Sequence, residues 1–193
     1  MALFMGAFLL AFISCKEKKK ERAVTKKYIS ILSLVKNQVA HIDTSLYVIR
    51  KIVILDSLHS DTSFIRREDF AGEAKEFLSI PDLSDPKVAK GFVEESPLFD
   101  QNLNRVIITY TPVDPLKEAI KKQELLVSPD MPDGDNVTSL IITSIVNNRN
   151  GYLKKEMLWQ MDKSFQVVVT SQLPGEPEKT VITKVSWNEE TDQ

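Results

Sequence analysis

The chain is poor in the residue types from which the commonest catalytic and metal sites are built. Cys15 is the only cysteine among 193 residues, so neither an intramolecular disulfide nor a paired-cysteine metal or redox site can form. Glycine occurs only six times, too rarely for a glycine-rich phosphate-binding loop, and the GxSxG and HExxH motifs are absent. We therefore nominate no catalytic residue, no cofactor-binding residue and no metal site.

The chain also lacks an excess of charge of either sign. Its formal net charge is -2 at pH 7, whereas a nucleic-acid-binding protein needs a strongly basic face. Hydrophobic residues make up 42% of the chain and charged residues 27%, which is close to the average of globular proteins and unlike that of disordered chains. The composition predicts a folded domain of ordinary size that does not bind nucleic acid.

What the chain does have is a distinctive beginning. Residues 1–15 contain no charged side chain, and the next seven residues carry five positive and two negative charges. The apolar stretch is shorter than the roughly 20 residues that a transmembrane helix needs, but it has the length of a signal-peptide core. We expect residues 1–14 to be a signal peptide and residues 15–23 to be a solvated, charged tether near lipid headgroups.

The segment Phe12-Ile13-Ser14-Cys15 resembles the lipobox of bacterial lipoproteins. In that family the cysteine thiol receives a diacylglycerol, the chain is cut before the cysteine, and the new amino group usually receives a further acyl chain such as palmitate. The resemblance implies lipidation of Cys15 and stable anchoring, because each buried methylene contributes about 0.8 kcal/mol. The residue after the cysteine is Lys16 and not aspartate. An aspartate at this position resembles a signal for retention in the inner membrane, so its absence favours the outer membrane. The alternative is that Cys15 is an ordinary buried cysteine.

Helical periodicity dominates the start of the expected domain, residues 24–190. Apolar residues recur at helical spacing, at Val24, Tyr28, Ile31, Leu32, Val35, Val39 and Ile42. This pattern predicts a helix that ends near residues 43–45. Residues 46–55 predict a strand buried on both faces, followed by a polar loop. A second helix is expected over 67–78, and a third over 86–90 with Ser84 as its cap.

The second half of the chain changes to the two-residue period of strands. Strands are expected over 104–111, 137–146, 152–161, 165–170 and 181–187, and the ambiguous segment 116–127 favours a strand over a helix. Asn150-Gly151 predicts a type I′ hairpin. The fold class expected is α+β, with N-terminal helices packed on an antiparallel meander of four to six strands. This order loosely resembles NTF2-like or cystatin-like folds, which implies no function.

Three groups of residues suggest a ligand site, and each has a structural alternative. Residues 56–61 contain Asp56, His59 and Asp61, which could ligate zinc but also suit a solvated turn; the other histidine, His41, lies in the first helix. The second group could form a calcium loop or an ordinary turn: Asp130, Asp133, Gly134, Asp135 and Asn136. The third could line an apolar pocket or fill the core: Met157, Trp159, Met161, Phe165 and Trp187. In all three groups the structural interpretation is favoured.

These observations lead to one functional hypothesis and one competitor. We expect a lipid-anchored, non-enzymatic binding or assembly protein of the cell envelope, held at the membrane by its anchor, that contacts an envelope protein or a small apolar ligand. The competing hypothesis is a small envelope hydrolase that works through aspartate or glutamate residues which the sequence does not identify. A deep pocket with two carboxylates of raised pKa would favour the hydrolase, and a flat or apolar surface would favour binding.

Overall fold

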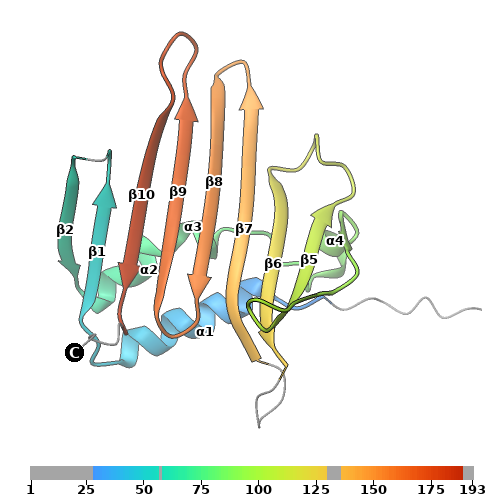
Figure 1. Cartoon of the computed structure of the whole chain (residues 1–193), viewed down its shortest axis with the longest axis horizontal. Helices are drawn as coiled ribbons and strands as arrows, with labels where there is room; N and C mark the ends of the chain where they lie inside the picture. Colours follow the sequence, from blue (N-terminus) through green and yellow to red (C-terminus); the bar gives the residue numbers. More distant parts are fainter. Residues whose placement is uncertain (1–27, 57, 130–135, 189–193) are drawn as a thin grey trace, which may run out of the picture.

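A computed structural model describes residues 28–56, 58–129 and 136–188 (Figure 1). Within them, ten strands form one antiparallel sheet with the order β2-β1-β10-β9-β8-β7-β6-β5-β3, and β4 also pairs with β5. The strands are β1 (Ile49–Ile54), β2 (Ser60–Ile65), β3 (Phe92–Glu94), β4 (Leu98–Asp100), β5 (Arg105–Pro112), β6 (Ile120–Ser128), β7 (Asn136–Asn148), β8 (Gly151–Gln160), β9 (Ser164–Gln172) and β10 (Lys179–Ser186). The helical segments are α1 (Ile31–Thr44), η1 (Arg67–Asp69), α2 (Phe70–Glu73), α3 (Lys75–Leu78) and α4 (Pro86–Ala89).

The expected fold class is wrong. The sheet has ten strands instead of four to six, and three of the four α-helices have only four residues each and follow the β1–β2 hairpin. The expectation failed because strands β2 and β4 are mostly exposed, and β3 and β4 have only three residues each, too few to show the alternation by which a half-buried strand is recognised. The molecule is a large antiparallel sheet with a thin helical layer on one face.

The sheet has two parts that are distant in sequence. Strands β5 to β10 lie side by side in chain order, so they form a meander. The earlier β1–β2 hairpin adds to the end of this meander through antiparallel pairing of β1 with β10, in which Lys51 lies opposite Val185. The N-terminal and C-terminal parts of the described chain therefore share one sheet.

The core lies between the helices and one face of this sheet. Cross-strand neighbours on this face continue in register from Leu125 through Leu140, Trp159 and Phe165 to Val185, and each of these five side chains is at most 1% exposed. The helical layer contributes the buried side chains on the other side of this core, namely Ile31, Val35, Ile42, Phe70, Ala74 and Phe77. In the view of Figure 1 the helices lie behind the sheet, which leaves the near face of the sheet uncovered.

Helix α1 ends where predicted, but it begins at Ile31, so Tyr28 lies before it and Val24 lies outside the described residues. Ser30 caps it by accepting a hydrogen bond from the Ser33 amide at 3.0 Å, and the helix ends at Thr44 with Ser45 as C-cap. Its buried residues Ile31, Val35 and Ile42 belong to the apolar periodicity seen in the sequence.

The other predicted helices are shorter or interrupted. Residues 67–78 form η1, α2 and α3 instead of one helix, because Ala74, with φ -81° and ψ 3°, interrupts it. Two ion pairs hold this segment on the sheet: Lys51–Glu73 at 2.8 Å and Lys155–Glu76 at 2.6 Å. Helix α4 is capped by Asp85, not by Ser84.

Strand β1 and the hairpin at Gly151 also differ from their predictions. Strand β1 is not buried on both faces, since Ile49 alone is fully buried, and the polar loop expected after it contains β2. Asn148 pairs with Gly151, so the turn residues are Arg149 and Asn150, and neither has the positive φ of a type I′ turn. Gly151 itself has φ +136°, and a Cβ atom there would lie 2.6 Å from the Gln172 carbonyl oxygen. The hairpin therefore requires glycine at this position.

Candidate functional site

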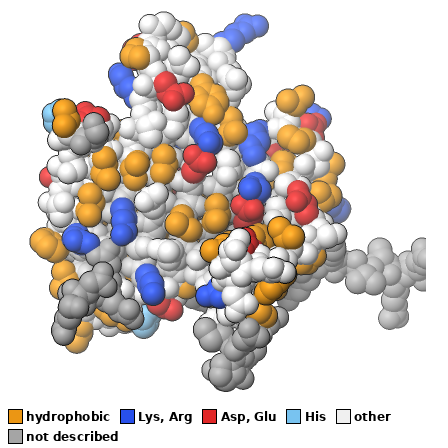
Figure 2. Space-filling view, in the orientation of Figure 1, with side chains coloured by type: hydrophobic (Ala, Val, Ile, Leu, Met, Phe, Trp, Pro, Cys, Tyr) orange, Lys and Arg blue, Asp and Glu red, His pale blue; other side chains and the backbone are white. Residues whose placement is uncertain are grey.

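The uncovered face of the sheet is the largest surface that the fold leaves without a second layer. Side chains alternate between the two faces along each strand, so the neighbours of core residues point to this face. Nine of them are partly exposed Ile, Leu or Val, which we call the open-face patch: Ile52, Ile54, Ile107, Leu126, Ile141, Ile145, Leu158, Val168 and Ile182. Figure 2 shows apolar side chains distributed over this face between charged and polar ones.

The register divides the patch into two groups. Ile54, Ile182 and Val168 lie opposite one another on β1, β10 and β9 and form one row. On the other side, Ile141 lies opposite Leu158, and Leu126 lies one strand away on β6. Glu156 of β8 separates the two groups, so the apolar surface of this face is divided. Apolar side chains that a fold leaves partly exposed beside polar ones are candidates for contact with another molecule.

Charged side chains lie on the same face, between and beside the apolar groups. Lys122 pairs with Glu124 at 3.0 Å on β6, and Lys154 pairs with Glu156 at 3.0 Å on β8. In the register, Glu156 lies opposite Val168 on β9. Apolar groups bordered by ion-paired polar residues are the composition of a protein-binding surface, where a dry centre is surrounded by a polar rim.

A hollow of about 590 Å³ lies at one end of the open face. Leu126 and Leu158 of the open-face patch line it together with polar residues from β5 and β7. Arg105 donates from Nε to Thr138 Oγ1 at 3.3 Å, and that hydroxyl donates to the Leu126 carbonyl at 3.1 Å. These hydrogen bonds fix the polar wall of the hollow beside its apolar floor.

A second hollow, of about 500 Å³, lies within the helical layer between α1 and the segment 67–78. Val39, Ala40, Ala71 and Leu78 form its apolar lining, and charged side chains of both segments surround it: Lys36, Asp43, Arg67 and Glu68. Its lining is thus apolar in part, with charged residues of both segments around it.

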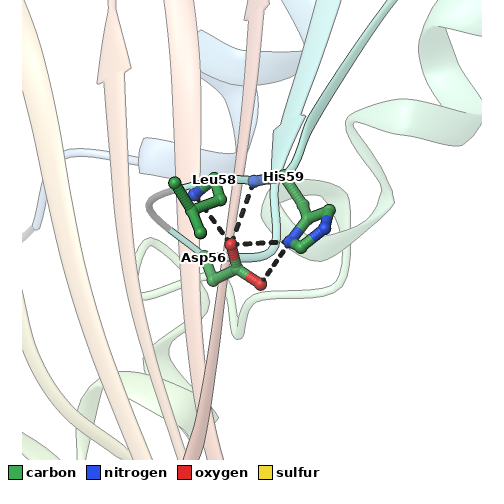
Figure 3. Close-up of polar contacts among 3 residues, drawn as sticks. All are labelled: Asp56, Leu58 and His59. Carbon is green, nitrogen blue, oxygen red and sulfur yellow. Dashed lines mark hydrogen bonds and ion pairs between the residues drawn. The ribbon is translucent and has the colours of Figure 1, made fainter.

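The expected zinc candidates near His59 form a turn. Asp56 Oδ1 accepts hydrogen bonds from the amides of Leu58 and His59 at 2.8 and 2.9 Å, and His59 Nδ1 lies 2.8 Å from the same carboxylate (Figure 3). The Leu58 amide, the His59 side chain and the His59 amide lower the pKa of Asp56. Both side chains are more than half exposed, so the arrangement closes the β1–β2 hairpin in solvent.

The remaining sequence candidates do not assemble into a metal site within the described residues. His41 packs edge-on against Tyr47, with ring centroids 6.2 Å apart, and lies on α1, away from the β1–β2 turn. Over the ranges 28–56, 58–129 and 136–188 no group of three His, Cys, Asp or Glu side chains is placed to hold a metal ion. Cys15 and the acidic residues 130–135 lie outside the described residues, and of the calcium candidates only Asn136 is described, as the first residue of β7.

The aromatic and methionine group fills the core, as favoured from the sequence. Trp159, Phe165, Trp187 and Met157 are at most 3% exposed, and Met161 packs against them. The Trp159 and Phe165 rings stack with centroids 5.1 Å apart. The aromatic side chains of this group are explained by packing, because they fill the core between the sheet and the helices.

Sequence reasoning missed one polar residue inside the core. Gln123 on β6 is 0% exposed, and neither of its side-chain polar atoms has a hydrogen-bond partner. It lies between Tyr110 and Ile142 in the cross-strand register. The sequence did contain a signal for it: the two-residue period of the strand places Gln123 on the same face as the apolar residues Leu125 and Val127.

The carboxylates with shifted pKa values are stabilised in their charged form. Burial raises the pKa of Asp82, but hydrogen bonds from the Ser84 amide and hydroxyl outweigh it and leave that pKa lowered. The Lys117 side chain and the Leu116 amide lower the pKa of Asp114. A general acid in a glycosidase-type site needs a raised pKa instead, so these residues do not support the hydrolase hypothesis.

No helix in the described ranges is long and apolar enough to span a bilayer. Comparison of the chain with protein-family models, with curated protein sequences and with solved structures finds no match. A functional argument for this chain therefore depends on its own residues.

Proposed function

We propose that this chain is a lipid-anchored, non-enzymatic binding protein of the cell envelope that contacts another protein through the open-face patch. The observation that carries the binding role is the uncovered sheet face with its nine partly exposed Ile, Leu and Val side chains. The anchor and the location rest on the lipobox-like segment that ends at Cys15, and on Lys16 for the outer membrane.

The shape of the open face favours a protein over a small molecule as the partner. Small ligands bind in concave sites that bury most of their surface, whereas the patch spreads across the sheet from β1 to β5. The ion pairs Lys122–Glu124 and Lys154–Glu156 supply the polar contacts that a protein interface has around its apolar centre.

The anchor is tested by mass spectrometry of the mature protein from its native host. We expect a chain that begins at Cys15 and carries a diacylglycerol and a further acyl group. A Cys15→Ser variant should move to the soluble fraction with its far-ultraviolet circular dichroism unchanged. An unmodified Cys15 in a chain that still begins at Met1 would exclude the anchor.

The binding surface is tested with a photo-reactive amino acid placed at position 158 of the full chain in living cells. We expect one discrete adduct with another envelope protein, identified by mass spectrometry, because Leu158 lies within the patch. The same probe at Leu46, which is 94% exposed and lies in the loop between α1 and β1, is the matched control.

A second substitution separates specific contact from collision. Ile141→Glu, directly opposite Leu158 on β7, should abolish the adduct because a charge would be buried in the apolar centre of the interface. If the adduct persists in this variant, or if the probe at position 46 gives the same product, the open face is not the binding surface.

A further inference from the structure

One edge of the sheet is open to a further strand. Strand β2 pairs with β1 in an unbroken register, from Ile49 opposite Ile65 to Ile54 opposite Ser60. Among the described residues no other strand pairs with β2. Five of its six residues are exposed and Ile65 is partly exposed, so the described chain leaves this strand uncovered.

The hydrogen bonds between β1 and β2 show which backbone groups of β2 remain available at this edge. The Leu55 amide donates to the His59 carbonyl at 3.0 Å, so the odd-numbered residues of β2 direct their amides and carbonyls toward β1. By the same alternation, Ser60, Thr62 and Phe64 direct theirs away from β1. An added strand would find three amide and three carbonyl groups in line.

Apart from the single charge of Asp61, strand β2 lacks the features that usually protect an edge. It contains no proline, no lysine or arginine and no bulge, and Phe64 is 73% exposed. The opposite edge differs, because β3 and β4 have three residues each and residues 95–97, which include Pro97, separate them. Of the two sheet edges that the described residues form, only the β2 edge offers a continuous strand.

We propose that β2 pairs antiparallel with β2 of a second copy of this chain, about a two-fold axis perpendicular to the sheet. Strand β2 can pair with itself in two registers without bringing its only charged residue, Asp61, opposite a like charge. When the axis passes at Thr62, Asp61 faces Ser63 of the second copy. When the axis passes at Ser63, Asp61 faces Ile65. In neither register do like charges meet. One competent edge in each chain gives a closed dimer and not a filament.

This symmetry has a consequence for the open face. A two-fold axis perpendicular to the sheet leaves both open faces on the same side, and both helical layers on the other. Phe64 lies on the open face, opposite Arg50 in the register, so it would extend this face across the junction. The dimer is independent of the proposed partner protein, because pairing at the edge leaves the patch itself uncovered.

Cysteine cross-linking tests the pairing in the full chain in its native membrane. Residues facing their own copy across antiparallel strands have Cα atoms about 4.5 to 5.5 Å apart, which suits a disulfide. We expect Thr62→Cys or Ser63→Cys, according to the register, to give a disulfide-linked dimer on mild oxidation. The matched controls are Ser96→Cys at the opposite edge and the unsubstituted chain, whose only cysteine is Cys15.

The oligomeric state provides a second measurement that does not depend on cysteine chemistry. The unsubstituted chain, purified in detergent, should have the mass of two chains by light scattering, and Thr62→Lys should reduce it to one by placing like charges beside the axis. Circular dichroism should stay unchanged, because Thr62 is exposed. A monomeric unsubstituted chain, cross-linking no higher than in the Ser96→Cys control, or an adduct with a different protein would each overturn the proposal.

Discussion

Both faces of the sheet carry large apolar side chains, but the core face carries more of them and the two faces differ in what covers them. Along β8, Met157 and Trp159 point into the core and are at most 3% exposed, whereas Leu158 points to the open face and is partly exposed. The helical layer explains the difference, since it packs only on the side of Trp159. The comparison indicates that one face determines the stability of the fold and the other is free to determine what the protein contacts.

The largest expected effect contrasts two neighbouring residues of β8. Trp159→Ala should lower the free energy of unfolding by about 3 to 5 kcal/mol, because it removes an aromatic side chain that packs on Phe70, Phe77 and Phe165. Leu158→Ala should lower it by less than about 1 kcal/mol, since Leu158 is partly exposed already. Urea unfolding of both variants measures the difference, and equal losses would mean that the open face also contributes to the core.

A smaller effect of opposite sign is expected at Gln123. Gln123→Met should raise the free energy of unfolding by about 1 to 2 kcal/mol, because it removes a buried amide without hydrogen-bond partners at similar side-chain volume. The matched change on the open face, Gln166→Met, should alter stability by less than about 0.5 kcal/mol. A destabilised Gln123→Met variant would show that the amide has a partner in solution, such as a buried water molecule.

The ion pairs of the two faces should differ by a smaller amount in their contribution to the free energy of unfolding. Glu76→Gln breaks the Lys155–Glu76 pair under the helical layer and should cost about 1 kcal/mol, since both side chains are at most 31% exposed. Glu156→Gln breaks the Lys154–Glu156 pair on the open face and should cost less than about 0.5 kcal/mol. Thermal unfolding at low and high salt would compare them, and an equal salt dependence would count against the distinction.

The smallest expected effect lies in the β1–β2 turn, which belongs to neither face. The Leu58 amide and the His59 side chain hold the pKa of Asp56 below its usual value of 3.8, so the charged turn stabilises the fold above that pH. This contribution should be lost as the pH falls through the lowered pKa. His59→Ala should move the pKa of Asp56 upward in an NMR titration, and an unchanged pKa would show that the backbone amides alone are responsible.

The sequence predicts those elements that have one buried and one exposed side. Helix α1 and the strands from β5 to β10 alternate between covered and uncovered sides, so their apolar residues recur at 3.6 or at 2 positions. The aromatic group around Trp159 was assigned to the core for the same reason. The sequence also indicated that one face of the meander meets solvent, through the polar residues Lys154, Glu156 and Gln160 on β8.

Two aspects of the structure could not be predicted from local pattern. Strand β2 is exposed along nearly its whole length, so its sequence, Ser60 to Ile65, resembles a polar loop. The size of the sheet depends on the pairing of β1 with β10, which joins residues more than a hundred positions apart, and no local signal specifies it. The open-face patch depends on this pairing too, because the row that includes Ile54 and Ile182 forms only when the two strands meet.

The position of β10 between β1 and β9 bears on the order in which the chain folds. The hairpin of β1 and β2 is synthesised early, yet its neighbour in the sheet is the last strand of the chain. An isolated two-stranded hairpin is at best marginally stable, so this part of the molecule stays incomplete until residues 179–186 arrive. During synthesis, an early release of the chain would leave two separated sheet fragments, each with an unpaired edge open to aggregation.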